Sequence, residues 1–154
     1  MDPARSLVAQ EQGAQVWERR IAPSLHEYIS RPAFERACQD FMWRSLRAGT
    51  LPVGLHFADV GTWWRAGDIK IDLVALDEAG AVTAAGSCKW TTALMDVSEY
   101  AALQADLMRA GFGGGETALF LFSRLGFTDR LRSLAASQKP PCVFLIGLPG
   151  LYAV

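Results

Sequence analysis

The amino-acid sequence predicts an α/β fold in which a central mixed β-sheet is flanked by helices. Two observations lead to this prediction. Three strand-like runs follow one another in the first half of the chain, and apolar strands alternate with amphipathic helices in the second half. The 154 residues, 51% of them hydrophobic, are enough for one domain with one core. We therefore predict a single domain over residues 1–154 with the order α-β-β-β-α-β-α-β.

The chain begins with a polar segment, 1–30, that is rich in Arg and Glu and carries apolar residues at roughly helical spacing. We expect this segment to be a helical lead-in. Ser30 and Pro32 then have the composition of a helix cap and first turn. Apolar residues recur every three or four positions after them, which predicts an amphipathic helix that ends at Gly49.

The next three elements are predicted to be strands. Runs rich in β-branched and aromatic residues cover 53–64, 69–76 and 82–90, and short turn-forming segments separate them. Such short connections join antiparallel neighbours. This part of the chain is therefore expected to form an antiparallel meander.

Helix crossovers are expected in the second half. Asp96 is a candidate N-cap for a helix that reaches Met108, and a second helix is predicted over 128–137. The runs 117–123 and 142–148 are apolar without alternation, as strands buried on both faces are. The predicted sheet is therefore covered by helices on both sides.

Composition excludes several classes of function. The formal net charge of −1 and the pI near 6.1 argue against a globally basic surface, so any site for a polyanion must be local. The three cysteines form no Cys-x-x-Cys pair and the two histidines are far apart, which argues against a zinc site and for a reducing compartment. No apolar run approaches the ~20 residues of a membrane span. We therefore expect a cytoplasmic protein with no membrane partner.

Two charged residues interrupt apolar strands. Asp72 lies within 69–76, and Lys89 lies within 82–90. A buried charge is unfavourable unless it is paired. If the turn pairs Leu76 with Ala81, Asp72 faces Ala85, and Ser87 and Lys89 project from the same face as Asp72. This arrangement is either a structural ion pair at the end of the sheet or part of a functional site.

These residues resemble a known layout. An Asp on the second strand, an acidic-x-Lys tripeptide on the third and a Glu on the preceding helix characterise the PD-(D/E)XK nuclease superfamily. Within it, the segments 60–64, 71–75 and 86–91 resemble the C-terminal domain of archaeal-type DEXX-box ATPases, also called domain of unknown function 234. The resemblance implies a restriction-endonuclease-like fold. It also implies that residues 1–30 are the linker from an ATPase module that this chain does not contain.

The resemblance further implies a set of site residues. Asp72, Glu35 and the backbone carbonyl of Cys88 would hold Mg²⁺ or Mn²⁺, which prefer oxygen ligands. Lys89 would lie beside the attacked phosphate, so that Asp72, Lys89 and Glu35 form the catalytic group. The residues expected to contact the phosphate backbone are Ser87, Lys70 and Gln104.

Two positions depart from that pattern. Ser87 stands where the superfamily has an acidic ligand, and a hydroxyl carries no charge to hold a metal ion. Lys70 stands where relatives commonly have an acidic residue, so that two lysines oppose Asp72. The missing carboxylate would have to come from elsewhere, and Glu35 and Glu99 are the candidate positions.

The sequence leaves several functions open. The first is a nuclease-like domain, associated with nucleic acid and most simply DNA, whose metal site is partly degraded; it is either a Mg²⁺-dependent phosphodiesterase or inactive. The alternative is a non-catalytic module that binds an ATPase module in cis or in trans, or that forms a homo-oligomer. A mean hydropathy of +0.14 favours this alternative, because it suggests an exposed apolar patch. A third reading is a relic that binds DNA without cutting it.

Overall fold

The computed structural model describes residues 25–65, 69–112, 116–137 and 142–152. The chain divides into two compact units, 1–33 and 34–154, and the second unit contains the entire β-sheet. Most of the predicted lead-in over 1–30 lies outside the described residues.

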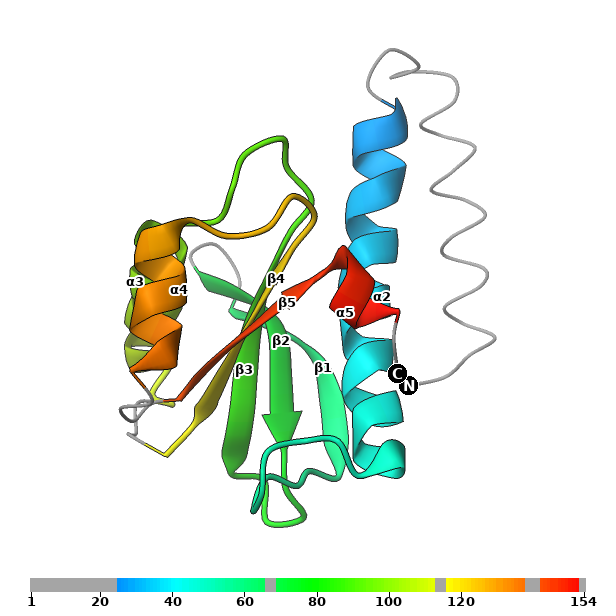
Figure 1. The fold of residues 1–154 in the computed structure, drawn as a ribbon. Helices are drawn as coiled ribbons and strands as arrows, with labels where there is room; N and C mark the ends of the chain where they lie inside the picture. Colours follow the sequence, from blue (N-terminus) through cyan, green and yellow to red (C-terminus); the bar gives the residue numbers. More distant parts are fainter. Residues whose placement is uncertain (1–24, 66–68, 113–115, 138–141, 153–154) are drawn as a thin grey trace. The chain divides into compact units, whose positions relative to one another are not determined.

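The sheet has five strands in the order β1-β2-β3-β4-β5. The first three, β1 (Asp59–Arg65), β2 (Ile69–Leu76) and β3 (Val82–Lys89), form an antiparallel meander, and β4 (Ala118–Ser123) and β5 (Val143–Gly147) run parallel to β3 (Figure 1). Two helices, α3 (Val97–Arg109) and α4 (Asp129–Ala136), make the crossovers between the parallel strands. The predicted mixed sheet and the predicted element order are confirmed.

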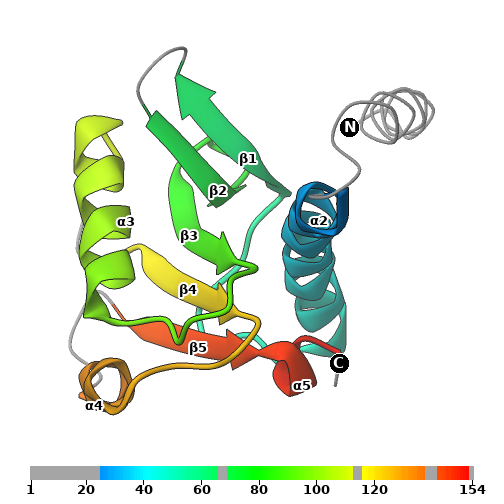
Figure 2. The same cartoon turned by 90° about the horizontal axis from the view of Figure 1, so that it is seen from above.

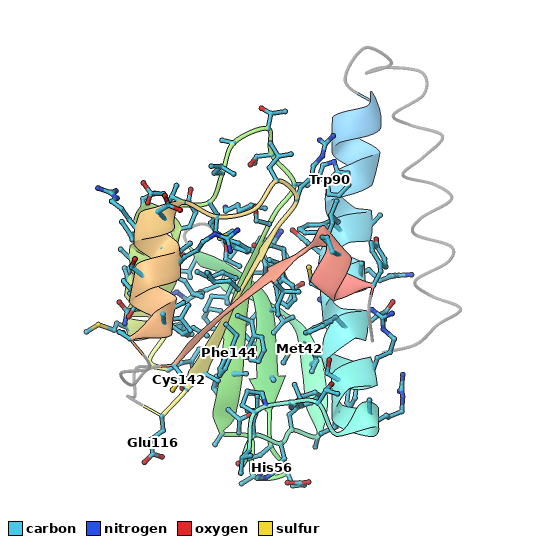
Figure 3. All side chains as sticks on the ribbon, viewed as in Figure 1. Met42, His56, Trp90, Glu116, Cys142 and Phe144 are labelled. Carbon is cyan, nitrogen blue, oxygen red and sulfur yellow. The ribbon has the colours of Figure 1, made fainter. Side chains whose placement is uncertain are left out.

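Helices cover both faces of the sheet (Figure 2). Helix α2 (Leu25–Ala48), from Phe34 onward, and the short α5 (Leu148–Leu151) pack on one face, which we call the α2 face. Helices α3 and α4 pack on the other, the α3 face. Met42 of α2 and Phe144 of β5 belong to the α2-face core, between helix and sheet (Figure 3). Within the described residues, no helix is long and apolar enough to cross a membrane.

The predicted starts of the two crossover helices are confirmed. Asp96 caps α3 and forms a capping box with Glu99, whose side chain accepts the backbone N–H of Asp96. Thr128 caps α4 by accepting the N–H of Leu131. Short polar side chains at these positions satisfy backbone groups that the helix itself leaves unpaired.

Two predicted boundaries were wrong, and one short helix was not predicted. Helix α2 starts at Leu25 rather than at Ser30 and continues through position 32, since the fixed φ of a proline is compatible with helical backbone. Strand β1 starts at Asp59 rather than at residue 53, since a turn with a positive φ at Gly54 precedes it. The four-residue α5 had no sequence signal long enough to predict it.

The predicted register between β2 and β3 was also wrong. Leu76 pairs with Val82 rather than with Ala81, and Ala85 pairs with Val74 rather than with Asp72. Ala81 is used in the turn, where its carbonyl accepts the N–H of Asp77. The turn is therefore longer than its composition suggested.

Candidate functional site

A β-bulge in β2 determines where Asp72 points. The β1–β2 register shifts between Gly61 and Trp63, so that Thr62 lies opposite two residues of β2, Asp72 and Leu73. Such a bulge interrupts the alternation of side chains along the strand. Two consecutive residues can then project towards the same side of the sheet.

The packing on either side of the bulge shows this interruption. Ile71 belongs to the α3-face core, whereas Leu73 belongs to the α2-face core, although the two are only two positions apart. Lys70 alternates with Ile71 and contacts Glu35 of α2, which puts Lys70 on the α2 face. The carboxylate of Asp72 lies beside Lys70 on that side.

The bulge is tied to α2 by a short chain of hydrogen bonds. The hydroxyl of Thr62 donates to the backbone carbonyl of Asp72 at 3.0 Å, and Nε2 of Gln39 donates to Oγ1 of Thr62 at 3.1 Å. A bulge leaves backbone groups without their usual partner in the ladder. The Thr62 side chain supplies that partner and fixes the position of Asp72 relative to the helix.

Glu35, Lys70 and Asp72 form one charge cluster. Nζ of Lys70 lies 2.8 Å from Oε1 of Glu35 and 3.5 Å from Oδ1 of Asp72. The two carboxylate side chains are 17% and 15% exposed, while that of Lys70 is 51% exposed. A single ammonium group thus lies between two carboxylates that are mostly withdrawn from water.

The electrostatics of this cluster favour the charged form of the lysine. Partial burial lowers the pKa of Lys70. The hydrogen bond and charge of Glu35, together with Asp72, raise it by more than burial lowers it, so the net pKa is above the ordinary value of 10.5. Lys70 is therefore a permanent cation at physiological pH. It neutralises one of the two negative charges beside it.

The second oxygen of Asp72 has a separate partner. Oδ2 accepts the backbone N–H of Cys88 at 2.9 Å. The paired residues of β2 and β3 run only as far as Leu73 and Gly86, so the carboxylate takes over as acceptor where the ladder ends. The family resemblance implied the backbone carbonyl of Cys88 as a metal ligand. The contact between Asp72 and Cys88 uses the N–H of Cys88 instead.

The Cys88 thiol is held protonated. It hydrogen-bonds the thiol of Cys38 on α2, and this bond, burial and the nearby carboxylates together raise the pKa of Cys88 well above its ordinary value. Both side chains are buried in the α2-face core. A protonated buried thiol is a poor nucleophile, so this pair serves packing rather than covalent catalysis.

Ser87 and Lys89 lie apart from this cluster. Strand β3 pairs with β4 without irregularity from Ala84 onward, so its side chains alternate. Cys88 points to the α2-face core, which directs Ser87 and Lys89 to the α3 face. The prediction that Asp72, Ser87 and Lys89 share one face was therefore wrong, because the bulge turns Asp72 the other way. No hydrogen bond or ion pair joins the Lys89 ammonium to any other residue in the described ranges.

The remaining predicted residues have other surroundings. Gln104 is half-buried on α3. The Glu99 carboxylate accepts hydrogen bonds from Asp96 and Ser98 in the cap of α3. Glu99 therefore does not join the Asp72 cluster, whereas Glu35, the other candidate for the missing carboxylate, does.

The residues of the cluster do not fit a divalent metal ion. Among the described residues, no three or more His, Cys, Asp and Glu side chains are grouped so that they could hold one. Glu35 and Asp72 supply two carboxylates, but the Lys70 ammonium lies between them. Ser87, where the resemblance expects a further ligand, is directed to the opposite face. We therefore derive no metal-dependent step from this site.

Sequence reasoning missed three residues of the site: Cys38, Gln39 and Thr62. Cys38 and Gln39 follow Glu35 at three and four positions, the spacing that puts side chains on one side of a helix, and this signal was available. Thr62 had no such signal. Its role depends on a bulge in the neighbouring strand, which the sequence of β1 does not encode.

Comparison with known proteins gives a match to a family model. The model of a protein family, DUF234, described as archaeal and bacterial proteins of unknown function, matches residues 1–102. This range contains Glu35, Lys70, Asp72 and Cys88. No curated protein and no solved structure matches the chain.

Proposed function

Because the chain belongs to the DUF234 family of archaeal and bacterial proteins of unknown function, its role has to be inferred from its own residues, and we propose that it is a non-catalytic interaction module. It has a nuclease-type fold in which Lys70 replaces the metal ion. Its partner is an ATPase module, in cis or in trans, or a second copy of the chain.

One observation carries this proposal: the contacts of Lys70 with both Glu35 and Asp72, at 2.8 and 3.5 Å. Mg²⁺ would need both carboxylates together with several water molecules in octahedral geometry. The ammonium group takes up that space, and its charge repels a second cation at this range. The carboxylate pair is therefore stabilised without a metal ion.

The separation of the other residues supports the same proposal. A phosphodiesterase of the PD-(D/E)XK type needs its lysine beside the metal-bound carboxylate, where it can stabilise the charge on the attacked phosphate. Here the lysine beside Asp72 is Lys70, while Lys89 points to the α3 face. Ser87 cannot supply negative charge from either face.

A Mg²⁺-dependent nuclease acting on DNA is the second candidate. The observation that favours it is that Glu35 and Asp72 lie within reach of one cation, a geometry that two carboxylate ligands of a metal ion also have. In that case Lys70, which is half exposed, would have to swing out towards solvent before the metal ion entered.

Nicking of supercoiled plasmid separates the two candidates. We expect no nicking by the native chain in Mg²⁺ or Mn²⁺, at protein concentrations equal to or above that of the plasmid. Nicking by the native chain that disappears in Asp72→Ala would overturn the proposal in favour of the nuclease. Lys89→Ala is the matched variant, because it removes a lysine outside the cluster. Nicking that this variant abolishes would be carried by the α3 face.

A further inference from the structure

Among the residues that the structure describes, no strand pairs with the outer edge of β1. β1 is the terminal strand of the sheet, and its sequence DVGTWWR contains neither proline nor lysine, the residues that commonly protect such edges. The bulge that disturbs its pairing lies in β2 and leaves β1 itself extended. Trp64, 70% exposed, adds a large apolar side chain to this edge. An edge of this kind is suited to pairing with another strand.

The charges of β1 are complementary to those of a second β1. Asp59 is at one end of the strand and Arg65 is at the other, and both are exposed. If two β1 strands pair antiparallel about a two-fold axis at Thr62, Asp59 of each copy lies opposite Arg65 of the other. The symmetry creates this pair of opposite charges twice. A cross-strand pair of opposite charges stabilises antiparallel strands.

The shape of the edge is also self-complementary. In the same register, Gly61 lies opposite Trp63 of the second copy, and Val60 lies opposite Trp64. A side chain added at Gly61 would meet no atom within 4 Å, and a hollow of about 140 Å³ lies over this part of β1 and β2. The indole of Trp63 lines this hollow in its own copy and packs edge-to-face against Phe112, with 5.0 Å between the ring centroids. The pairing therefore puts a large side chain opposite the strand's smallest residue.

We propose that two copies of this chain associate through antiparallel pairing of their β1 strands, centred on Thr62, so that the two sheets become continuous. This inference rests on the proposed function as an interaction module and names its partner as a second copy. The strand at the other edge of the sheet, β5, lacks the pattern: its sequence VFLIG has no charges. The self-complementarity is thus specific to β1.

The size of the contact predicts a weak, reversible dimer. Seven residues per strand form a small interface, at the low end of the sizes found for specific complexes. We therefore expect the native chain to change from monomer to dimer with increasing concentration. Sedimentation equilibrium across a range of concentrations measures this directly. A native chain that stays monomeric throughout would overturn the inference.

Charge changes test the register. Asp59→Arg alone puts Arg opposite Arg in both symmetric pairs, and Arg65→Asp alone puts Asp opposite Asp. We expect each single variant to weaken self-association about tenfold or more. The double variant Asp59→Arg/Arg65→Asp restores opposite charges and should recover the dimer. An equimolar mixture of the two single variants should form a heterodimer, because all four charges are then complementary.

Glu116→Arg is the control, because it also replaces a carboxylate with Arg. Glu116 is exposed, precedes β4 and projects away from β1 (Figure 3). Unchanged self-association in both single variants, or a failure of the double variant to recover it, would overturn the β1 pairing. Circular dichroism establishes that each variant is folded. The nicking assay is independent of these measurements, so a monomeric chain without nuclease activity would refute the dimer and leave the non-catalytic module in place.

Discussion

The backbone N–H of Cys88 donates a 2.9 Å hydrogen bond to Oδ2 of Asp72, at the point where β2 and β3 stop pairing. The other oxygen of Asp72 lies 3.5 Å from Nζ of Lys70. Both sides of the carboxylate are therefore engaged within the chain. An aspartate with such contacts contributes to the fold, whether or not it has any role in chemistry.

Removing the Asp72 carboxylate should destabilise the domain. Asp72→Ala leaves the buried N–H of Cys88 without its acceptor and Lys70 with one carboxylate fewer. We expect the free energy of unfolding to fall by about 1–3 kcal/mol, the usual penalty for a buried polar group left unpaired. Chemical denaturation of the two proteins measures the difference.

Two further variants define the cause of that loss. Asp72→Asn keeps an oxygen acceptor for the Cys88 N–H and should lose less stability than Asp72→Ala. Asp106→Ala removes a carboxylate that is 33% exposed and lies 3.6 Å from the guanidinium of Arg109 on α3. It should change stability by less than about 0.5 kcal/mol. Equal losses in Asp72→Ala and Asp106→Ala would refute the structural role of Asp72.

Gly86 should not tolerate a side chain. A Cβ at this position would lie 2.8 Å from the backbone carbonyl oxygen of Phe120 in β4 and 3.4 Å from Cβ of Leu73. Backbone in the middle of a sheet cannot move aside easily, so we expect Gly86→Ala to destabilise the domain by about 2 kcal/mol. Gly61→Ala is the matched control, because a Cβ there meets nothing within 4 Å. Thermal unfolding curves that coincide for the two variants would contradict the close packing of β3 against β4.

The cap of α3 should make stability depend on pH. Hydrogen bonds from the Thr128 hydroxyl and the Val97 N–H, followed by Arg130, lower the pKa of Asp96 below its ordinary value of 3.8. A lowered pKa in the folded state stabilises the fold above pH 3.8, and this contribution is lost as the pH falls through the folded-state value. The native chain should therefore be more stable than Asp96→Asn at pH 7, with a difference that shrinks in acid.

The Thr128 hydroxyl provides the control for that pH dependence. Thr128→Ser keeps the donor to Asp96 at this position, whereas Thr128→Val removes it. Melting temperatures measured from pH 7 to pH 3 should show a smaller pH-dependent loss for Thr128→Val than for Thr128→Ser. The same loss in both would mean that the hydroxyl does not affect the titration of Asp96.

The sequence was sufficient for those features that depend on neighbours along the chain. The cap at Asp96, the start of a helix near 128, the element order and the burial of the strands on both faces follow from local composition and periodicity. The face on which Asp72 lies does not. It depends on a bulge opposite Thr62, and therefore on how two strands pair rather than on either strand alone.

Glu35 and Lys70 illustrate the same limit in the candidate site. The sequence singled out both residues, one as a metal ligand and the other as a departure from the family pattern. Their contact across 35 positions requires α2 to pack against β2 with a defined rotation about its axis. Alternation in β3, by contrast, was correctly expected to put Ser87 and Lys89 on one face, but the bulge in β2 puts Asp72 on the other.

Binding of Mn²⁺ to the native chain and to Lys70→Glu, followed by electron paramagnetic resonance, tests most directly whether Lys70 replaces a metal ion. Lys70→Glu removes the cation and adds a third carboxylate beside Glu35 and Asp72. We predict no Mn²⁺ binding at this site in the native chain and measurable binding in Lys70→Glu that is lost when Asp72→Ala is added. Binding to the native chain that Asp72→Ala abolishes would contradict the account.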